Sequence, residues 1–267
     1  AMLAAELHAV PTPETEALFR RIRSQAPPRP GSLLTRGAAL SPSPFLEGPL
    51  VGREREYTTL IKLYRAASHN RAQVVVLIGE AGIGKTRLAT EFLTWAAAQG
   101  ADILQGRAFE RGGRLPYQLL VEALRRRLEC ENAPDDLLSD IWLAELTRLL
   151  PELRDRYPDL PLPFTGLGEA EARSHLFEAV ARLFQALVEQ APLVLFLDDI
   201  QWADAASLDL LQYVGRHWTE SGTSVLALLN LREDSLAQTP ALKDWLSSLG
   251  RALPVTRLLL GPLSAEA

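Results

Sequence analysis

Residues 79–86 constrain the fold of this chain more than any other feature of its sequence. They read Gly-Glu-Ala-Gly-Ile-Gly-Lys-Thr, which fits the pattern G-x-x-x-x-G-K-[ST], and they follow the apolar run 74–78. Gly82 and Gly84 permit backbone conformations and close approaches that a Cβ atom would block, so successive N–H groups can wrap an anion at the start of a helix. The run therefore predicts a phosphate-binding loop between a buried strand and a helix.

Side chains at the end of this loop predict a nucleotide bound together with magnesium. Lys85 carries a positive charge that can reach the β and γ phosphates, and the hydroxyl of Thr86 can ligate Mg²⁺. We therefore expect ATP or ADP with Mg²⁺ as the ligands. The alternative interpretation is a glycine-rich turn that binds no ligand. The residues expected to contact nucleotide here are Gly79, Ala81, Gly82, Ile83, Gly84, Lys85, Thr86 and Arg87.

Two adjacent carboxylates follow another apolar run. Residues 193–197 read Leu-Val-Leu-Phe-Leu and lead into Asp198 and Asp199. Carboxylates at the end of a buried strand are costly unless a cation compensates their charge. A magnesium ion would supply that charge, held by Asp198 directly or through water, while Asp199 would orient or deprotonate the attacking water. Acidic residues also follow strands without binding a metal. The interpretation of this pair as a magnesium site therefore depends on the phosphate loop in the same chain.

Three further residues are candidates at the edge of the same site. Arg232 ends an apolar run, so it would project from the same sheet edge as the loop, where it could sense the γ phosphate and stabilise its charge. The alternative is a surface arginine paired with Glu233 or Asp234. Gly52 and Arg53 precede a helical stretch, where a turn could approach the adenine base. The alternative for them is an ordinary helix start.

Short apolar runs alternate with helical stretches after residue 50, which predicts an α/β fold with a parallel sheet and crossover helices. The proline-rich stretch 151–163 divides one crossover and indicates an insertion on one face of the sheet. The expected strands are residues 73–78, 102–107, 193–197, 224–231 and 255–260. The expected helices are residues 53–68, 84–99, 117–129, 169–190, 205–218 and 240–249.

The chain is expected to contain three parts. Residues 1–25 include a short amphipathic helix and are interpreted as the helical tail of an upstream domain. Residues 26–49 are rich in Pro, Gly and Ser, a composition typical of a linker. Residues 50–267 form the P-loop nucleotide-binding domain.

Charge and composition exclude several functions for this chain. It has 267 residues, a formal net charge of −5 and a pI of about 5.5, so its surface would repel a phosphate backbone. We therefore expect DNA contact only through domains outside this chain. Cys130 is the single cysteine, and the four histidines lack metal-ligand spacing. The apolar runs are far shorter than the roughly 20 residues that span a bilayer. These features favour a cytoplasmic protein without membrane contact.

Taken together, the motifs resemble one known family, the signal-transduction ATPases with numerous domains (STAND). This is the branch of AAA-like P-loop proteins that includes regulators of the maltose-activator type. The resemblance covers about four fifths of the chain, and its most specific parts are Val-Gly-Arg-Glu before the loop and Asp-Asp-x-x-Trp-Ala-Asp after the run 193–197. The matching segments are residues 50–54, 79–86, 197–204, 230–233 and 260–264.

The resemblance implies both a fold and roles for the candidate residues. The fold is a three-layer α/β/α P-loop NTPase whose five parallel strands have the order 5-1-4-3-2. Gly52 and Arg53 would border the adenine, and Arg232 would be the sensor arginine. The residues implied for catalysis are Asp199, Lys85 and Arg232, and those implied for the metal are Thr86 and Asp198.

A regulatory role also follows from the resemblance. ADP would hold the full-length protein closed, and the ATP form would self-associate and activate transcription. Residues 10–19 resemble the end of a bacterial transcriptional activator domain, which favours a transcriptional regulator. The helical and winged-helix parts that follow in this family are not seen before Ala267, so we expect a truncated segment. Alone, it would be monomeric, bind nucleotide weakly and hydrolyse ATP slowly.

Two other functions stay open at this point. A small-molecule phosphotransferase would need an acceptor pocket and an arginine-rich lid, for which residues 107–114 are the one basic loop available. A defence-type or death-type STAND scaffold would use the same switch for a different effector, and only flanking domains would distinguish it.

Overall fold

The computed structural model describes residues 51–110, 116–129, 137–166 and 168–263. The expected helical tail at 1–25 and linker at 26–49 lie outside the described residues, so both assignments stay predictions.

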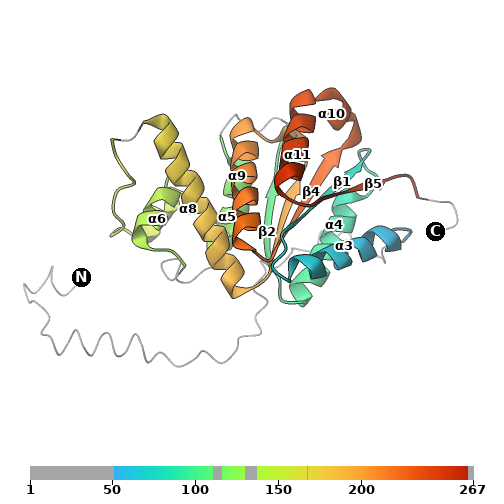
Figure 1. The fold of residues 1–267 in the computed structure, drawn as a ribbon, viewed down its shortest axis with the longest axis horizontal. Helices are drawn as coiled ribbons and strands as arrows, with labels where there is room; N and C mark the ends of the chain where they lie inside the picture. The colour runs from blue at the N-terminus through green and yellow to red at the C-terminus, as the bar shows by residue number, and fades with distance from the viewer. Residues whose placement is uncertain (1–50, 111–115, 130–136, 167, 264–267) are drawn as a thin grey trace, which may run out of the picture. The chain divides into compact units, whose positions relative to one another are not determined.

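Five parallel strands form one sheet at the centre of the described chain (Figure 1). Their order is β2-β3-β4-β1-β5, which confirms the predicted order 5-1-4-3-2 read from the opposite edge. All five expected strands are present, and their ends differ by at most one residue from the expected ones. The strands are β1 (Gln73–Gly79), β2 (Asp102–Arg107), β3 (Leu193–Asp198), β4 (Val225–Arg232) and β5 (Val255–Leu260).

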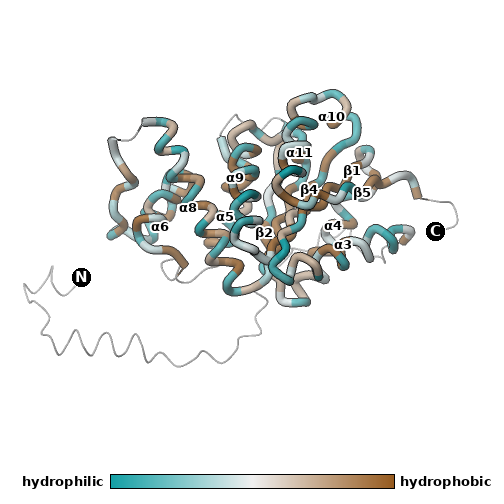
Figure 2. Tube along the Cα trace, in the orientation of Figure 1, coloured by the Kyte–Doolittle hydropathy of each residue, from teal (hydrophilic) through white to brown (hydrophobic). Residues whose placement is uncertain are grey.

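Alternate residues of the central strands pack into two hydrophobic cores, one on each face of the sheet. In β3, Leu195 and Leu197 belong to one core and Val194 and Phe196 to the other. Successive side chains of a strand point to opposite faces, so a strand covered on both faces is apolar throughout. Figure 2 shows the hydrophobic colouring concentrated along these strands.

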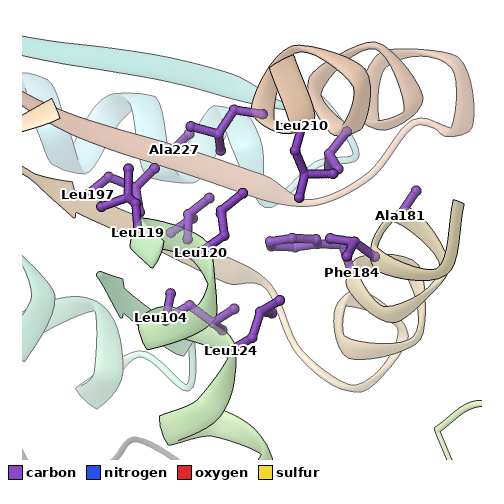
Figure 3. Close-up of a cluster of buried hydrophobic side chains, with 14 of the residues drawn as sticks. Leu104, Leu119, Leu120, Leu124, Ala181, Phe184, Leu197, Leu210 and Ala227 are labelled. Carbon is purple, nitrogen blue, oxygen red and sulfur yellow. The ribbon is translucent and has the colours of Figure 1, made fainter. Parts of the chain in front are cut away.

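Helices cover both faces, which gives three layers. Figure 1 shows α3 and α4 on one side of the sheet and α9 and α11 on the other. The side chains of Leu104, Leu120 and Phe184, from β2, α5 and α8, gather in the larger core (Figure 3). The long helices are α3 (Glu54–Ala67), α4 (Lys85–Ala98), α5 (Gln118–Glu129), α8 (Glu169–Gln190), α9 (Ala205–Ser221) and α11 (Pro240–Ala252).

The segment between β2 and β3 contains the expected insertion, and buried leucines of its short helices join the larger core. Glu145, which is fully buried, accepts hydrogen bonds from the backbone N–H of Phe164 at 2.6 Å and from Nε of Arg148 at 2.9 Å. This carboxylate therefore ties Phe164, the residue after the proline-rich stretch 151–163, to the helix that carries Glu145. The short helices of the insertion are α6 (Asp140–Leu146) and α7 (Glu152–Arg156). Two more short helical segments lie outside it, the 3₁₀ turn η2 (Ile200–Trp202) after β3 and α10 (Glu233–Gln238) after β4. These four segments were not predicted from the sequence.

Parallel strands place their carboxyl ends along one edge of the sheet. Gly79 pairs with Arg232, and Arg107 pairs with Asp198. The phosphate loop, the two carboxylates and Arg232 therefore meet at this edge. In the described part of the chain, no helix is long and apolar enough to cross a membrane.

Candidate nucleotide-binding site

The phosphate loop turns through two glycines with positive φ, Gly82 at 79° and Gly84 at 99°. A Cβ atom at either position would meet no neighbour within 4 Å, so the backbone conformation, rather than space, is the reason for glycine. The helix α4 begins at Lys85, one residue later than predicted, because Gly84 is in the left-handed region. The exposed Ala81 and Gly82 lie at the tip of the loop, and Gly79 is buried at its base.

Lys85 is folded back onto the loop. Its Nζ donates hydrogen bonds to the carbonyl oxygens of Gly79 and Glu80, each at 2.8 Å, and the residue is 8% exposed. Burial lowers the pKa of Lys85, and the nearby carboxylates of Asp199 and Asp198 oppose that shift. The ammonium group is therefore held beside the loop, at the position from which it would reach a bound phosphate.

Oxygen and amide groups from three elements meet next to Lys85. The Thr86 hydroxyl lies 3.2 Å from Oδ2 of Asp198, and Nδ2 of Asn230 donates to Oδ1 of Asp198 at 2.9 Å. A hydroxyl and a carboxylate are hard oxygen ligands of the kind that Mg²⁺ prefers alongside water and phosphate. The donor set therefore fits magnesium, and Thr86 and Asp198 are the residues that would hold it.

Asn230 lies among these groups and was not predicted as a site residue from the sequence. It is fully buried in β4, and besides Asp198 its amide lies 3.5 Å from the hydroxyl of Thr86. Its Oδ1 atom is buried without a hydrogen-bond partner among the described residues. The signal was present in the sequence, because Asn230 is the only polar residue in the run 225–231. A buried amide in such a strand costs free energy unless it has a partner.

Asp199 is held by donors on both carboxylate oxygens. Arg107, at the end of β2, approaches Oδ2 with Nη2 at 3.1 Å and Nε at 3.3 Å, and Nε2 of Gln201 donates to Oδ1 at 3.0 Å. The backbone of Asp199 is in the left-handed region, with φ 56° and ψ 41°. No role was predicted for Gln201, since nothing in its local pattern distinguishes it from a surface glutamine.

Arg232 ends β4 beside the base of the loop, as predicted. Its Nη2 lies 3.3 Å from Oδ2 of Asp234, and its backbone N–H donates to Oε1 of Gln201 at 3.3 Å. The side chain is 35% exposed. Arg232 therefore lies at the predicted sheet edge and also forms the pair with Asp234 that the alternative interpretation expected. The sensor role of Arg232 stays a prediction.

The residues expected near adenine lie at the start of α3. Gly52 has φ 69°, and Arg53 is 6% exposed, with its guanidinium directed to backbone carbonyls. Arg87 lies on the first turn of α4, with Nη2 3.9 Å from a carboxylate oxygen of Glu91. Roles for these residues in nucleotide binding stay predictions.

A family model described as "AAA ATPase domain" matches residues 49–228, more than half of the chain. The chain belongs to this family. AAA ATPase domains bind nucleotide with Mg²⁺, and this one carries its loop, carboxylates and Arg232 on the sheet edge described above.

Similarity to individual proteins extends over the same region. The chain is 28% identical over 185 residues to hybrid signal transduction histidine kinase G of Dictyostelium discoideum, covering 63% of this chain and 5% of that protein. It is 24% identical over 231 residues to uncharacterized protein R02095 of Rhizobium meliloti (strain 1021), covering 82% of this chain and 21% of that protein. The chain thus spans about a fifth or less of the length of these relatives.

Among solved structures, this AAA ATPase domain is similar to Cdc6p from Pyrobaculum aerophilum. The TM-score is 0.48 and the identity 18%, with 80% of this chain and 47% of that chain covered.

The arrangement in this AAA ATPase domain separates two chemical tasks. Lys85, Thr86 and Asp198 form a group suited to phosphate and metal. Asp199, the residue after Asp198, is the carboxylate that could accept a proton from water, and its two oxygens accept hydrogen bonds from Arg107 and Gln201. Binding groups are therefore assembled, while the candidate base is restrained.

Proposed function

We propose that this chain is the nucleotide-controlled switch domain of a multidomain signal-transduction ATPase, which binds ATP or ADP with Mg²⁺ and hydrolyses ATP slowly. The observation that carries the proposal is the assembly of Lys85, Thr86 and Asp198 beside the phosphate loop, with Asp199 held next to them by Arg107 and Gln201. If the attacking water has to use the acceptor positions that these contacts leave on Asp199, hydrolysis is slow, and slow hydrolysis gives a switch time to report its bound nucleotide.

Binding would rest on the loop and its neighbours. The N–H groups around Gly82 and Gly84 would surround the phosphates at the start of α4, and Lys85 would exchange its carbonyl partners for phosphate oxygens. Thr86 and Asp198 would hold Mg²⁺, which neutralises charge on the β and γ phosphates when bound. Gly52 and Arg53 would border the adenine.

Hydrolysis would be limited by the contacts of Asp199. Arg107 and Gln201 occupy most of the roughly four acceptor positions of the carboxylate and fix its orientation, so the attacking water would be limited to the positions that remain. Arg232 would stabilise charge on the γ phosphate in the transition state. Slow hydrolysis would then reset the ATP form to the ADP form.

The wider role is proposed from the relatives and from the resemblance stated above. The name of the Dictyostelium relative supports a place in signalling, and residues 10–19 support transcriptional regulation. ADP would keep the full-length protein closed, the ATP form would self-associate, and DNA would be contacted only by domains outside this chain.

Steady-state ATP turnover, with and without small-molecule phosphate acceptors, tests this proposal. We expect turnover below about 1 s⁻¹, against an enzyme median of about 10 s⁻¹, and no dependence on an acceptor. Asp199→Asn should lower the rate by roughly a hundredfold, because the amide cannot accept a proton, with little change in Mg·ADP affinity. Fast, acceptor-dependent turnover would instead establish a phosphotransferase, and parental turnover by Asp199→Asn would remove Asp199 as the base.

A further inference from the structure

The side chain of Arg53 is buried although it lies at the start of a surface helix. The residue immediately precedes α3, its carbonyl oxygen accepts the N–H of Tyr57 at 2.9 Å, and it is 6% exposed. A buried guanidinium costs free energy unless its N–H groups have acceptors. The partners of Arg53 therefore indicate what it does.

Arg53 connects parts of the chain that are distant in sequence. Its Nη2 donates to the carbonyl oxygen of Ile83 at 3.2 Å and to that of Gly261 at 2.6 Å. Its Nη1 lies 3.2 Å from a carboxylate oxygen of Glu56. Ile83 belongs to the phosphate loop, and Gly261 is the first residue after β5. One guanidinium thus joins the loop to the segment that leaves the sheet.

Backbone packing already brings these two segments together. Gly79, at the base of the loop, pairs with Leu260 at the end of β5. A Cβ atom on Gly79 would lie 2.7 Å from the carbonyl oxygen of Leu260, so the strands approach closely at this level. The contacts of Arg53 extend this approach beyond the ends of the strands.

Holding the carbonyl of Ile83 also fixes a donor of the loop. A trans peptide unit is planar, so its C=O and N–H point in opposite directions. The carbonyl of Ile83 points to Arg53, and the N–H of Gly84 in the same peptide unit must therefore point away from it. That N–H is one of the donors expected to hold phosphate. Lysine cannot reproduce the arrangement, because it lacks the planar fork of several donors.

We propose that Arg53 is a positioning residue that aims the N–H of Gly84 for phosphate binding and couples the loop to the segment after β5. The proposal rests on the nucleotide-binding function proposed above. Nucleotide that fixes the loop would then also order residues 261–263, and linkage makes the effect reciprocal. The chain leaving β5 would thereby sense occupancy of the site.

Hydrogen exchange with and without Mg·ADP, together with calorimetry, tests the coupling in this chain. The variants are Arg53→Lys and, as a matched control, Glu56→Gln, which removes the carboxylate partner but keeps both carbonyl contacts. Peptides covering residues 79–86 and 255–263 report the two segments, and one covering β3 reports the fold.

In the parent, Mg·ADP should slow exchange in both segments. Arg53→Lys should weaken Mg·ADP binding about tenfold, the size expected for a lost hydrogen bond to a charged group, and should remove the ADP-dependent protection at 255–263 while β3 stays protected. Glu56→Gln should keep both responses, with affinity within about twofold.

Two results would overturn the coupling while leaving the nucleotide site in place. One is a parent protein that binds Mg·ADP but shows no change in hydrogen exchange at 255–263. The other is an Arg53→Lys protein that keeps parental affinity and protection in both segments. A parent that binds no nucleotide would overturn the proposed function itself, and the coupling with it.

Discussion

At the scale of single residues, the contacts of Asp199 set the expected behaviour of the site. Its place in the site was predictable, because two carboxylates follow an apolar run in a chain that also carries a phosphate loop. Its contacts with Arg107 and Gln201 were not predicted: the order 5-1-4-3-2 places β2 beside β3, but the contact with Arg107 depends on the register that pairs Arg107 with Asp198. Asn230 was predictable in principle, as a single amide in an apolar run, but only its contacts with Thr86 and Asp198 reveal its purpose.

Removing the restraint should speed up hydrolysis. Arg107 is 57% exposed and Asp199 25%, and exposed ion pairs contribute about 0.2–1 kcal/mol, so Arg107→Ala should raise turnover roughly twofold to fivefold. Steady-state phosphate release measures this. Arg125→Ala, which breaks the exposed pair with Glu152 on another part of the surface, should leave turnover at the parental rate. A slower Arg107→Ala protein would mean that Arg107 assists the reaction.

Nucleotide affinity should fall at alkaline pH, and Lys85 should cause the fall. Burial places the pKa of Lys85 below its ordinary 10.5 in the free protein, whereas bound phosphate favours the charged ammonium and raises it. Affinity is then constant below the lowered pKa and decreases above it, by up to about tenfold per pH unit, because binding must take up a proton. Calorimetry across this range measures the decrease. Lys85→Arg, whose guanidinium stays charged, should bind with no such decrease.

At the scale of elements, the strands and long helices were predictable and the short helices were not. Strands buried on both faces give unbroken apolar runs, and long amphipathic helices give a clear period. The helix α10 has six residues and none of them is buried, so no apolar pattern marks it. Tyr117, the first residue of the expected helix 117–129, has φ 65° and lies before α5, and its N–H donates to Oδ1 of Asp204.

The contact between β2 and α5 depends on a glycine. A Cβ atom at Gly106 would lie 2.2 Å from the carbonyl oxygen of Leu119, so backbone must move to admit it. Gly106→Ala should lower the free energy of unfolding by roughly 1–3 kcal/mol, as overpacked sites do. Gly250→Ala provides the control in α11, where the nearest atom would be at 3.9 Å, and it should raise stability by up to about 1 kcal/mol. Urea unfolding measures both changes, and an unfolding midpoint of Gly106→Ala equal to that of the parent would contradict this account of Gly106.

At the scale of the whole described molecule, the order of strands explains why one site forms. The loop after β1, the carboxylates after β3 and Arg232 at the end of β4 come from separate parts of the sequence, and parallel pairing aligns them on one edge. The sequence motifs predicted this edge because each motif follows an apolar strand. The insertion between β2 and β3 packs on the larger core, where its contacts could not be anticipated from local pattern.

Titration of Mg·ADP into the parent protein, Lys85→Ala and Lys62→Ala by calorimetry tests the central claim most directly. Lys62 is an exposed lysine of α3, so its replacement removes the same charge away from the loop. The account predicts one site in the parent, unchanged affinity in Lys62→Ala, and a loss of roughly a hundredfold or more in Lys85→Ala, since hydrogen bonds to charged groups are each worth about 1.5–3 kcal/mol. Parental affinity in Lys85→Ala would contradict the assignment of the phosphate loop.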